Sequence, residues 1–183
     1  MAMNKKLLDC SVLFVCLGNI CRSPTAHGVF EQMLIDAGMD QRISVDSCGT
    51  GDWHIGNPPD ARSQETAAAS GYNLSHLRSR QLAQSDFKQF DFIFAMDKQN
   101  LADIRQWQGA QASTSTIELF LKFAFDGLQS DNEEHLKQSI IAEQHCFEVP
   151  DPYYGGADGF DLVLDMIKAA SEITIEKIAG VMQ

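Results

Sequence analysis

The stretch that most constrains the fold is an apolar run followed by a short loop and a helix start. The run Val12–Val15 is β-branched and aromatic, which is typical of a buried strand. Ser23 and Pro24 suit the start of a helix, because serine is a frequent cap and proline is tolerated in the first turn. The sequence therefore predicts a strand–loop–helix unit whose loop runs from Cys16 to Arg22.

A loop in this position is suited to binding an anion. Its backbone N–H groups point inward, next to the positive end of the following helix, and such an arrangement binds oxyanions such as phosphate. Arg22 adds a planar fork of donors that matches two phosphate oxygens. Cys16 lies at the floor of the same loop, where the positive potential favours its thiolate. A nucleophile and an oxyanion cradle in one loop indicate attack on a phosphoryl group.

Two motifs resemble one known family. Residues Cys16–Pro24, CLGNICRSP, resemble the signature loop of the low-molecular-weight protein tyrosine phosphatases, and Asp151–Tyr154, DPYY, resembles that family's acid loop. The two motifs stand in the family's order near opposite ends of the chain, and the resemblance extends from about Val12 to the C-terminal helix. It implies a four-stranded parallel sheet with strand order 2-1-3-4.

Strands alternate with helices along the rest of the chain, which predicts an α/β fold in three layers. The expected architecture is a doubly wound parallel sheet with helices on both faces. A length of 183 residues suits one domain, 1–183. After the first strand, the predicted strands are 42–47, 90–96 and 117–121. The predicted helices are 25–37, 60–70, 98–106 and 158–180.

Residues 126–146 form a connection that, by the resemblance, is longer than the family's usual one before the acid loop. We interpret it as an insertion that forms a surface helix, with Leu136, Ile140 and Ile141 along one face. The alternative hypothesis is a lid beside the active site, which is motivated only by its position shortly before Asp151.

The resemblance also assigns catalytic roles. Cys16 attacks phosphorus to give a phosphocysteine, while Arg22 and the loop amides hold the oxygens. Asp151 protonates the leaving phenolate and then takes a proton from water. Without the cysteine loop, Asp151 would be interpreted as an ordinary Asx turn. The remaining residues of the predicted phosphate-binding loop are Leu17, Gly18, Asn19, Ile20 and Cys21.

Four further residues are predicted to brace the loop. Asn19 tolerates left-handed backbone geometry, and its amide can tie the loop to its surroundings. Ser23 can donate a hydrogen bond to Cys16 and so favour the thiolate. The family's network also includes a serine and a histidine, which map to Ser47 and His76. Because residues 75–80 can be aligned one position either way, the alternative is that His76 is a surface histidine.

Three aromatic residues are predicted to form the rim of a deep slot around an aryl phosphate: Trp53, Tyr153 and Tyr154. Such a slot selects phosphotyrosine, because the shorter phosphoserine cannot bring its phosphorus down to the sulfur. The alternative for all three is core packing. Ile20 supports the aryl interpretation. By the resemblance, related arginine phosphatases have a polar threonine at this position, whereas the apolar Ile20 leaves room for an aromatic ring.

The five cysteines are an odd number without the spacing of a disulfide scaffold, which suits a reducing cytosol. One hypothesis is that Cys21 forms a reversible disulfide with Cys16 and protects it from overoxidation. The alternative is that Cys21 is a small buried apolar residue. Cys10, Cys48 and Cys146 are interpreted as structural or incidental.

Charge and hydropathy limit the partners. The chain has 14 Lys and Arg against 25 Asp and Glu, a formal net charge of -11, which argues against nucleic acid or an anionic membrane as the main partner. No apolar run reaches membrane-spanning length, and the apolar core of the N-terminus is too short for a secretion signal. We expect a cytoplasmic protein, a monomer or weak dimer, that acts on phosphotyrosine-containing proteins.

Two other function classes remain as alternatives. Arsenate reductases of the same fold share the Cys-to-Arg loop, but they need a pair of resolving cysteines near residues 80–95, and this chain has none there. A noncatalytic phosphate-binding module would need neither an activated thiol nor a placed acid. Neither a cofactor nor a metal is expected, because Cys16, Cys21 and His27 have poor ligand spacing and Arg22 would repel a cation.

Overall fold

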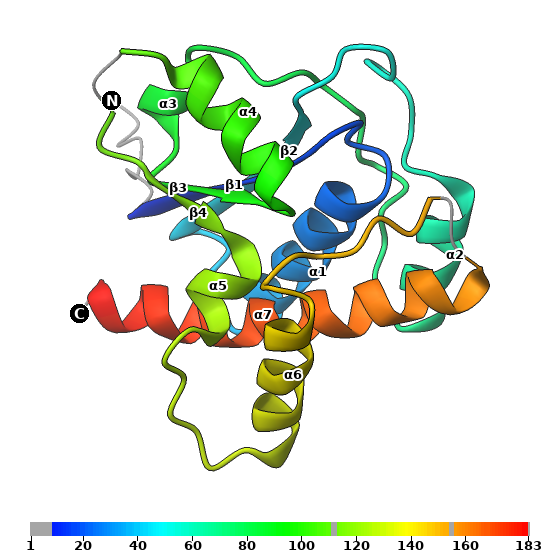
Figure 1. Ribbon diagram of the computed structural model, residues 1–183, viewed down its shortest axis with the longest axis vertical. Helices are drawn as coiled ribbons and strands as arrows, with labels where there is room; N and C mark the ends of the chain where they lie inside the picture. The colour runs from blue at the N-terminus through cyan, green and yellow to red at the C-terminus, as the bar shows by residue number, and fades with distance from the viewer. Residues whose placement is uncertain (1–8, 111–112, 154–155, 183) are drawn as a thin grey trace, which may run out of the picture.

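The centre of the computed structural model is a four-stranded parallel sheet in the order β2-β1-β3-β4 (Figure 1). The structure describes residues 9–110, 113–153 and 156–182. The strands are β1 (Cys10–Cys16), β2 (Ile43–Gly49), β3 (Phe92–Ala95) and β4 (Thr116–Leu119). The predicted parallel sheet and its order are therefore confirmed.

Helices cover both faces of this sheet. Figure 1 shows α3 and α4 on one side, and α1, α5 and α7 on the other. Their bounds are α1 (Arg22–Asp36), α2 (Ala61–Ala69), α3 (Asp86–Gln89), α4 (Lys98–Gln108), α5 (Phe120–Phe125), α6 (Glu133–Gln144) and α7 (Ala157–Val181). No helix among the described residues is long and apolar enough to cross a membrane.

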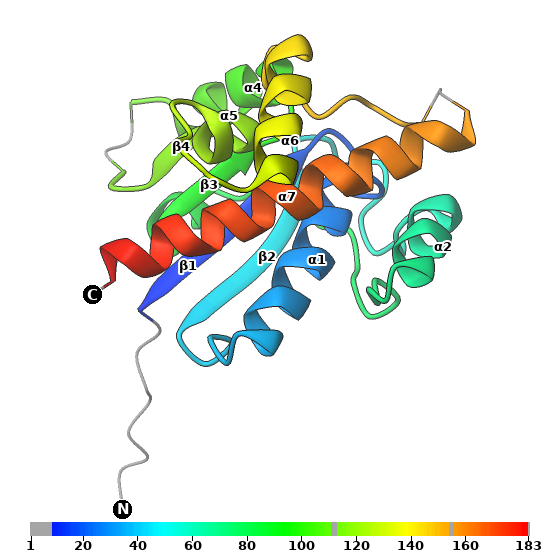
Figure 2. The same cartoon turned by 90° about the horizontal axis from the view of Figure 1, so that it is seen from below.

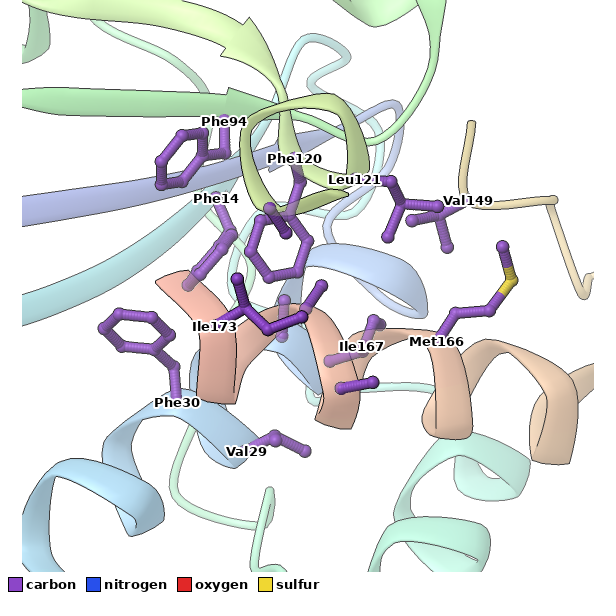
Figure 3. Close-up of a cluster of buried hydrophobic side chains, with 14 of the residues drawn as sticks. Phe14, Val29, Phe30, Phe94, Phe120, Leu121, Val149, Met166, Ile167 and Ile173 are labelled. Atoms are coloured by element: carbon purple, nitrogen blue, oxygen red, sulfur yellow. The ribbon is translucent and has the colours of Figure 1, made fainter. Parts of the chain in front are cut away.

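The core is divided by the central strand β1, whose side chains alternate between the two faces. Phe14 points to the α1/α7 face, where its ring lies 5.4 Å from Phe30 and 4.9 Å from Phe120 (Figure 3). Leu13 and Val15 point to the opposite face, toward α3 and α4. Phe14 is fully buried, so its replacement by alanine is expected to cost about 3–5 kcal/mol. This packing fixes the strand that ends at Cys16.

The closing helix α7 runs along one face of the molecule, beside α1, α5 and α6 (Figure 2). Its apolar positions recur at helical spacing, and Met166, Ile167 and Ile173 enter the same cluster as Phe14 (Figure 3). The chain that connects α6 to α7 crosses toward the carboxyl ends of the strands and carries Asp151 there.

Several predicted boundaries differ from the structure. The fourth strand was predicted at 117–121, but β4 ends at Leu119, and Phe120 and Leu121 begin α5. Both residues are fully buried, and a buried apolar residue fits a strand or a helix, so their apolar character does not distinguish the two. Short helices α3 and α5 were not predicted, and β2 continues through Cys48 and Gly49, beyond the predicted end at Ser47.

On α6, Leu136 and Ile140 are 42% and 57% exposed, and the residues that the helix buries are His135, Gln138 and Ala142. One prediction about side-chain placement was wrong. Ser23 is not a helix cap, because α1 begins at Arg22 with no side-chain cap. The Ser23 side chain is fully buried and turns toward the loop instead.

Candidate active site

Cys16 lies at the carboxyl end of β1, which pairs with β2 on one side and with β3 on the other. In a parallel sheet this is the point where the connections diverge to opposite faces, and ligands bind there. The loop from Cys16 leads directly into α1, which starts at Arg22. The phosphate loop, residues 16–22, therefore lies between a strand end and a helix N-terminus, as predicted.

Hydrogen bonds from outside hold the backbone of the phosphate loop in place. Four of its carbonyl oxygens accept from residues beyond the loop. The pairs, acceptor first, are Cys16 with the Thr50 N–H (2.9 Å), Leu17 with the Gly51 N–H (2.9 Å), Gly18 with the Ser79 hydroxyl (3.1 Å), and Ile20 with the Asp60 N–H (2.7 Å). Because these carbonyls face outward, the amides are left to the inner side, where the Asn19 N–H donates to Cys16 Sγ at 3.2 Å.

Two positions explain why this loop needs its particular residues. Asn19 has a φ of 53°, in the left-handed region that asparagine tolerates. Gly49, at the end of β2, lies directly against the loop, and a Cβ there would come within 2.7 Å of the Leu17 carbonyl oxygen. A side chain at Gly49 would therefore push the loop away from the sheet.

A hydrogen-bond network continues from the thiol into the protein. Cys16 Sγ lies 3.0 Å from Ser23 Oγ, which accepts from Asn19 Nδ2 at 2.9 Å. Asn19 Nδ2 also donates to Ser47 Oγ at 3.0 Å, and Asn19 Oδ1 accepts from the Arg80 N–H at 3.0 Å. Because Ser23 Oγ accepts from Asn19, its own hydroxyl hydrogen can be donated either to the sulfur at 3.0 Å or to the Cys48 carbonyl at 3.3 Å. Such a donor stabilises a thiolate.

The histidine of this network is His27, and the assignment to His76 was wrong. His27 Nδ1 lies 3.2 Å from Ser47 Oγ, whereas His76 is at the surface and pairs with Glu31 at 2.9 Å. Burial lowers the pKa of His27, although Asp46 opposes this, so the ring is neutral at pH 7. Ser47 accepts its hydrogen bond from the asparagine amide and can therefore donate its own hydrogen to Nδ1.

Arg22 is buried beside the thiol, with its side chain only 5% exposed. Its Nη1 donates to Asp97 at 2.5 Å and to the Val149 carbonyl at 3.2 Å, and its Nη2 donates to Asp151 at 3.3 Å. Burial alone would lower the pKa of Arg22, but the Cys16 thiolate and the two aspartates outweigh it and raise the pKa. The guanidinium is therefore permanently charged and fixed in direction.

Asp97 was not identified in the sequence. It is the N-cap of α4, and its Oδ1 accepts from the Asn100 N–H. It follows the end of β3, the strand next to β1, so the parallel topology brings it to the same edge of the sheet as Cys16. That position, directly after the predicted strand 90–96, was the available signal.

Asp151 makes the contact of an Asx turn and also reaches Arg22. Its Oδ1 accepts from the Tyr153 N–H at 3.0 Å, as in an Asx turn, while its Oδ2 contacts Arg22. The side chain is 41% exposed, so it faces the solvent side of the site. The structure thus brings a carboxyl group to the mouth of the cup whose floor holds Cys16.

A cavity of about 270 Å³ lies over the thiol. Its lining consists of Cys16, Leu17, Gly18, Ile20, Cys21, Arg22, Trp53, His54, Asp151 and Tyr153. Trp53 and Tyr153 are 61% and 42% exposed, which places them at the rim rather than in the core. Tyr154 lies outside the described residues. His54 was not predicted as part of the site, and its ring meets Trp53 edge-on at 6.3 Å.

Both rim residues are supported from behind. The Trp53 ring covers Gly51, where a Cβ would come within 2.4 Å of it. The Arg62 guanidinium lies 5.2 Å from the Tyr153 ring centroid, and its Nη1 donates to the Tyr153 carbonyl at 3.2 Å. Arg62 also pairs with Asp60, whose N–H holds the Ile20 carbonyl. The rim on that side is thereby connected to the phosphate loop.

All five cysteines are free in the structure, and only Cys146 is exposed. Burial raises the pKa of Cys21 to about 12, and it raises that of Cys10 to about 11, with Cys48 also shifted upward. These three thiols are therefore neutral at pH 7. The disulfide between Cys21 and Cys16 stays a hypothesis.

Residues 126–146, including α6, contribute no side chain to the cavity over the thiol. The helix α6 packs on α5 and α7 instead. The interpretation of this segment as an insertion with a surface helix stays a prediction, as does the alternative that it acts as a lid.

Comparison with known sequences identifies the family. Residues 11–181 match the model of the low molecular weight phosphotyrosine protein phosphatase family, and the chain belongs to it. A relative from Schizosaccharomyces pombe, named low molecular weight phosphotyrosine protein phosphatase, is 45% identical over 150 residues, 81% of this chain and 84% of the relative.

Solved structures agree with this assignment. The crystal structure of YfkJ from Bacillus subtilis superposes with a TM-score of 0.80 at 36% identity and covers 98% of this chain and 100% of its own. The drosophila arginine phosphatase superposes with a TM-score of 0.75 at 28% identity, covering 91% of this chain and 96% of its own. The fold is thus shared by relatives whose names refer to different phosphorylated residues.

Proposed function

We propose that this enzyme hydrolyses phosphotyrosine in proteins, and aryl phosphates generally, through a phosphocysteine formed on Cys16. The observation that carries this proposal is that one cavity holds three groups: a buried thiol at its floor, Arg22 beside the thiol, and Asp151 at the mouth. Hydrolysis of a phosphomonoester through a cysteine needs this combination of a nucleophile, an oxyanion cradle and a proton donor.

In the first step the Cys16 thiolate attacks phosphorus in line with the leaving phenolate. The S–P bond forms while the P–O bond to the phenol breaks, and Asp151 gives its proton to the leaving oxygen. The loop amides and the Arg22 guanidinium bind the three equatorial oxygens, whose charge redistributes in the transition state. These donors are already fixed by the outward hydrogen bonds of the loop, so little reorganisation is required.

In the second step water attacks the phosphocysteine. Asp151, now ionised, takes a proton from this water, the S–P bond breaks, and inorganic phosphate leaves the regenerated thiolate. Ser23 Oγ lies 3.0 Å from the sulfur, and a hydrogen bond that it donates there stabilises the sulfur as a leaving group. The same carboxyl group thus acts first as acid and then as base.

The preference for an aryl group rests on the walls of the cavity. Trp53 and Tyr153 line it with largely exposed rings, and Ile20 adds an apolar side chain. An aromatic ring fits such walls, and its length brings phosphorus down to the sulfur. The alternative substrate is phosphoarginine, because a relative of the same fold is named an arginine phosphatase. The polar threonine-like residue expected for that activity is replaced here by Ile20.

The decisive experiment is rapid-quench trapping of the phosphoenzyme with phosphotyrosine and phosphoarginine peptides. Wild type is expected to form a transient cysteine-linked phosphoenzyme with the phosphotyrosine peptide and at most a trace with phosphoarginine. Cys16→Ser should form none and lose at least about 10⁴-fold in turnover. Asp151→Asn should form it slowly from the peptide.

Two outcomes would overturn the proposal. A Cys16→Ser enzyme with normal turnover would exclude the cysteine nucleophile. Faster phosphoenzyme formation with phosphoarginine than with phosphotyrosine would show that the enzyme is an arginine phosphatase instead. Cys21→Ser serves as the matched control, because it changes a thiol of the same loop whose pKa is raised rather than one that attacks.

We also propose that the enzyme works in the cytoplasm as a monomer or weak dimer. Four of its five cysteines are buried free thiols, which a reducing compartment maintains. Sedimentation of the purified protein at several concentrations measures the state of assembly.

A further inference from the structure

A second groove lies next to the catalytic cavity, on the far side of Trp53. It measures about 530 Å³ and shares Leu17 and Trp53 with the catalytic cavity, so the two spaces are neighbours. The lining residues are Leu17, Thr50, Gly51, Trp53, Gln84, Asp103, Gln106 and Trp107. No step of the phosphate transfer uses the residues on its outer side, which come from α4 and from the loop before α3.

The chemistry of this groove is that of a site for a basic side chain. Both tryptophans of the chain, Trp53 and Trp107, line it. Indole faces attract lysine and arginine by cation–π interaction, and they also pack against the apolar stems of these side chains. Of the eight described residues in the lining, only Asp103 carries an ionisable side chain.

Asp103 is available for such a partner. It is half-buried, and its only interaction with described residues is the hydrogen bond that its Oδ1 accepts from Gln99 at 2.8 Å. No lysine or arginine of the described chain neutralises it. A half-buried carboxylate without a cation attracts one more strongly than an exposed carboxylate does.

We propose that this groove binds a lysine or arginine side chain that flanks the phosphotyrosine of a protein substrate. This inference rests on the proposed function, since it requires the phosphotyrosine in the neighbouring cavity. Trp53 forms the wall between the two spaces, so one substrate segment can place its phosphorylated ring on one side and its basic side chain on the other. A net charge of -11 favours basic segments in addition.

The first test uses short phosphotyrosine peptides that are neutral except for one lysine or one glutamate, moved through each position on either side of the phosphotyrosine. With wild type, at least one position should give a kcat/KM about 5-fold higher with lysine than with glutamate. Asp103→Asn should reduce this ratio to below about 2-fold, and Asp103→Lys should invert it.

The matched control is Glu65→Gln, which removes a charge from an exposed position on α2 outside both cavities. It should leave the lysine preference unchanged. Hydrolysis of a small aryl phosphate, which cannot reach the groove, should be equal in wild type and Asp103→Asn. If that hydrolysis is absent from wild type, the proposed function fails. If it is normal but no position prefers lysine, or the preference survives in Asp103→Asn, only the groove assignment fails.

A direct measurement uses the indole N–H resonances of the two tryptophans in the Cys16→Ser protein, titrated with the best lysine peptide and its glutamate counterpart. The lysine peptide should shift both Trp53 and Trp107. The glutamate peptide should shift Trp53 alone, because Trp107 does not line the catalytic cavity. An unmoved Trp107 in the lysine titration would overturn the proposal.

Discussion

The two halves of the active site are held by different means. The phosphate loop, residues 16–22, is fixed by backbone hydrogen bonds from neighbouring loops and by the buried side chains of Asn19 and Ser23. The acid segment, residues 146–153, is positioned by side chains: Arg22 contacts Asp151, and Arg62 holds Tyr153. The phosphate loop is thus held by its own backbone and buried side chains, whereas the end of the acid segment depends on contacts with two arginine side chains.

Local geometry shows the same contrast. In the acid segment Cys146 and Phe147 both have positive φ, 53° and 59°, so the chain turns sharply as it leaves α6. Its backbone then returns to the sheet through the Val149 N–H, which donates to the Met96 carbonyl at 2.7 Å. Beyond that anchor Asp151 is 41% exposed, whereas Cys16 is 3% exposed. We therefore expect changes in the phosphate loop to affect every substrate, and changes in the acid segment to depend on the leaving group.

The largest effect after loss of the nucleophile is expected for Arg22→Lys. Lysine keeps the charge but cannot bridge two phosphate oxygens or bind Asp97 and Asp151 at once. The value of kcat should fall about 10² to 10³-fold for all substrates alike. Steady-state kinetics with an aryl phosphate and a phosphopeptide measures this, and Arg42→Lys, a surface pair with Asp9, is the control. A loss below about 5-fold would show that the fork geometry is not used.

Asp151→Asn should have an effect that varies with the substrate, as large as that of Arg22→Lys for an ordinary phenol and much smaller for an acidic one. The asparagine cannot supply a proton, so a phenol of ordinary pKa should leave about 10² to 10³-fold more slowly. A strongly acidic phenol needs little protonation, and its release should change by less than about 10-fold. The measurement is the dependence of kcat/KM on the pKa of the leaving phenol. An equal loss for both phenols would contradict the role of Asp151 as the acid.

The fold was predictable from the sequence where one conformation alone satisfies the pattern. The apolar run before Cys16, with a loop and Ser-Pro after it, leaves little choice but a strand and a helix. The order of the strands came from the family resemblance. The boundary between β4 and α5 was not predictable. Phe120 and Leu121 are fully buried, and buried apolar residues fit a strand and a helix equally well.

The site was predictable only where the residues are close in sequence or carry a motif. Residues 16–22 and Asp151 were predicted in this way, and the structure brings them to one cavity. Asp97 and His27 were not, because their roles depend on contacts over 75 residues with Arg22 and over 20 residues with Ser47. A histidine transferred by alignment need not occupy the same place.

The role of His27 can be separated from simple packing. His27→Asn places an amide oxygen near the position of Nδ1 and can still accept from Ser47, whereas His27→Leu cannot. We expect kcat to fall about 10-fold in His27→Leu, because Ser47, which accepts from Asn19, loses its fixed partner, and less than about 3-fold in His27→Asn. The KM for an aryl phosphate should change little in either. Equal losses in kcat would indicate a packing role only.

Stability against pH provides an independent measurement of the same residue. Burial lowers the pKa of His27 in the fold, so the unfolded chain binds a proton more readily. The stability that neutral His27 contributes is therefore present above about pH 6.5 and is lost as the pH falls toward the folded pKa. Urea unfolding at about pH 7.5 and about pH 5.5 should show a smaller difference in His27→Asn than in wild type. An unchanged difference would show that His27 is not the group responsible.

The smallest effect is expected at the attachment of the acid segment, where Arg62 stacks on the Tyr153 ring and binds its carbonyl. Arg62→Met removes both contacts and should raise the KM for aryl phosphates about 3-fold, with kcat changed by less than about 2-fold. Arg62→Lys retains the charge without the planar stack and should behave as Arg62→Met does. If the lysine variant has a normal KM, Arg62 acts by attracting the anion. In that case the backbone, rather than this side chain, positions the rim at Tyr153, and the two halves of the site are built more alike than the contacts indicate.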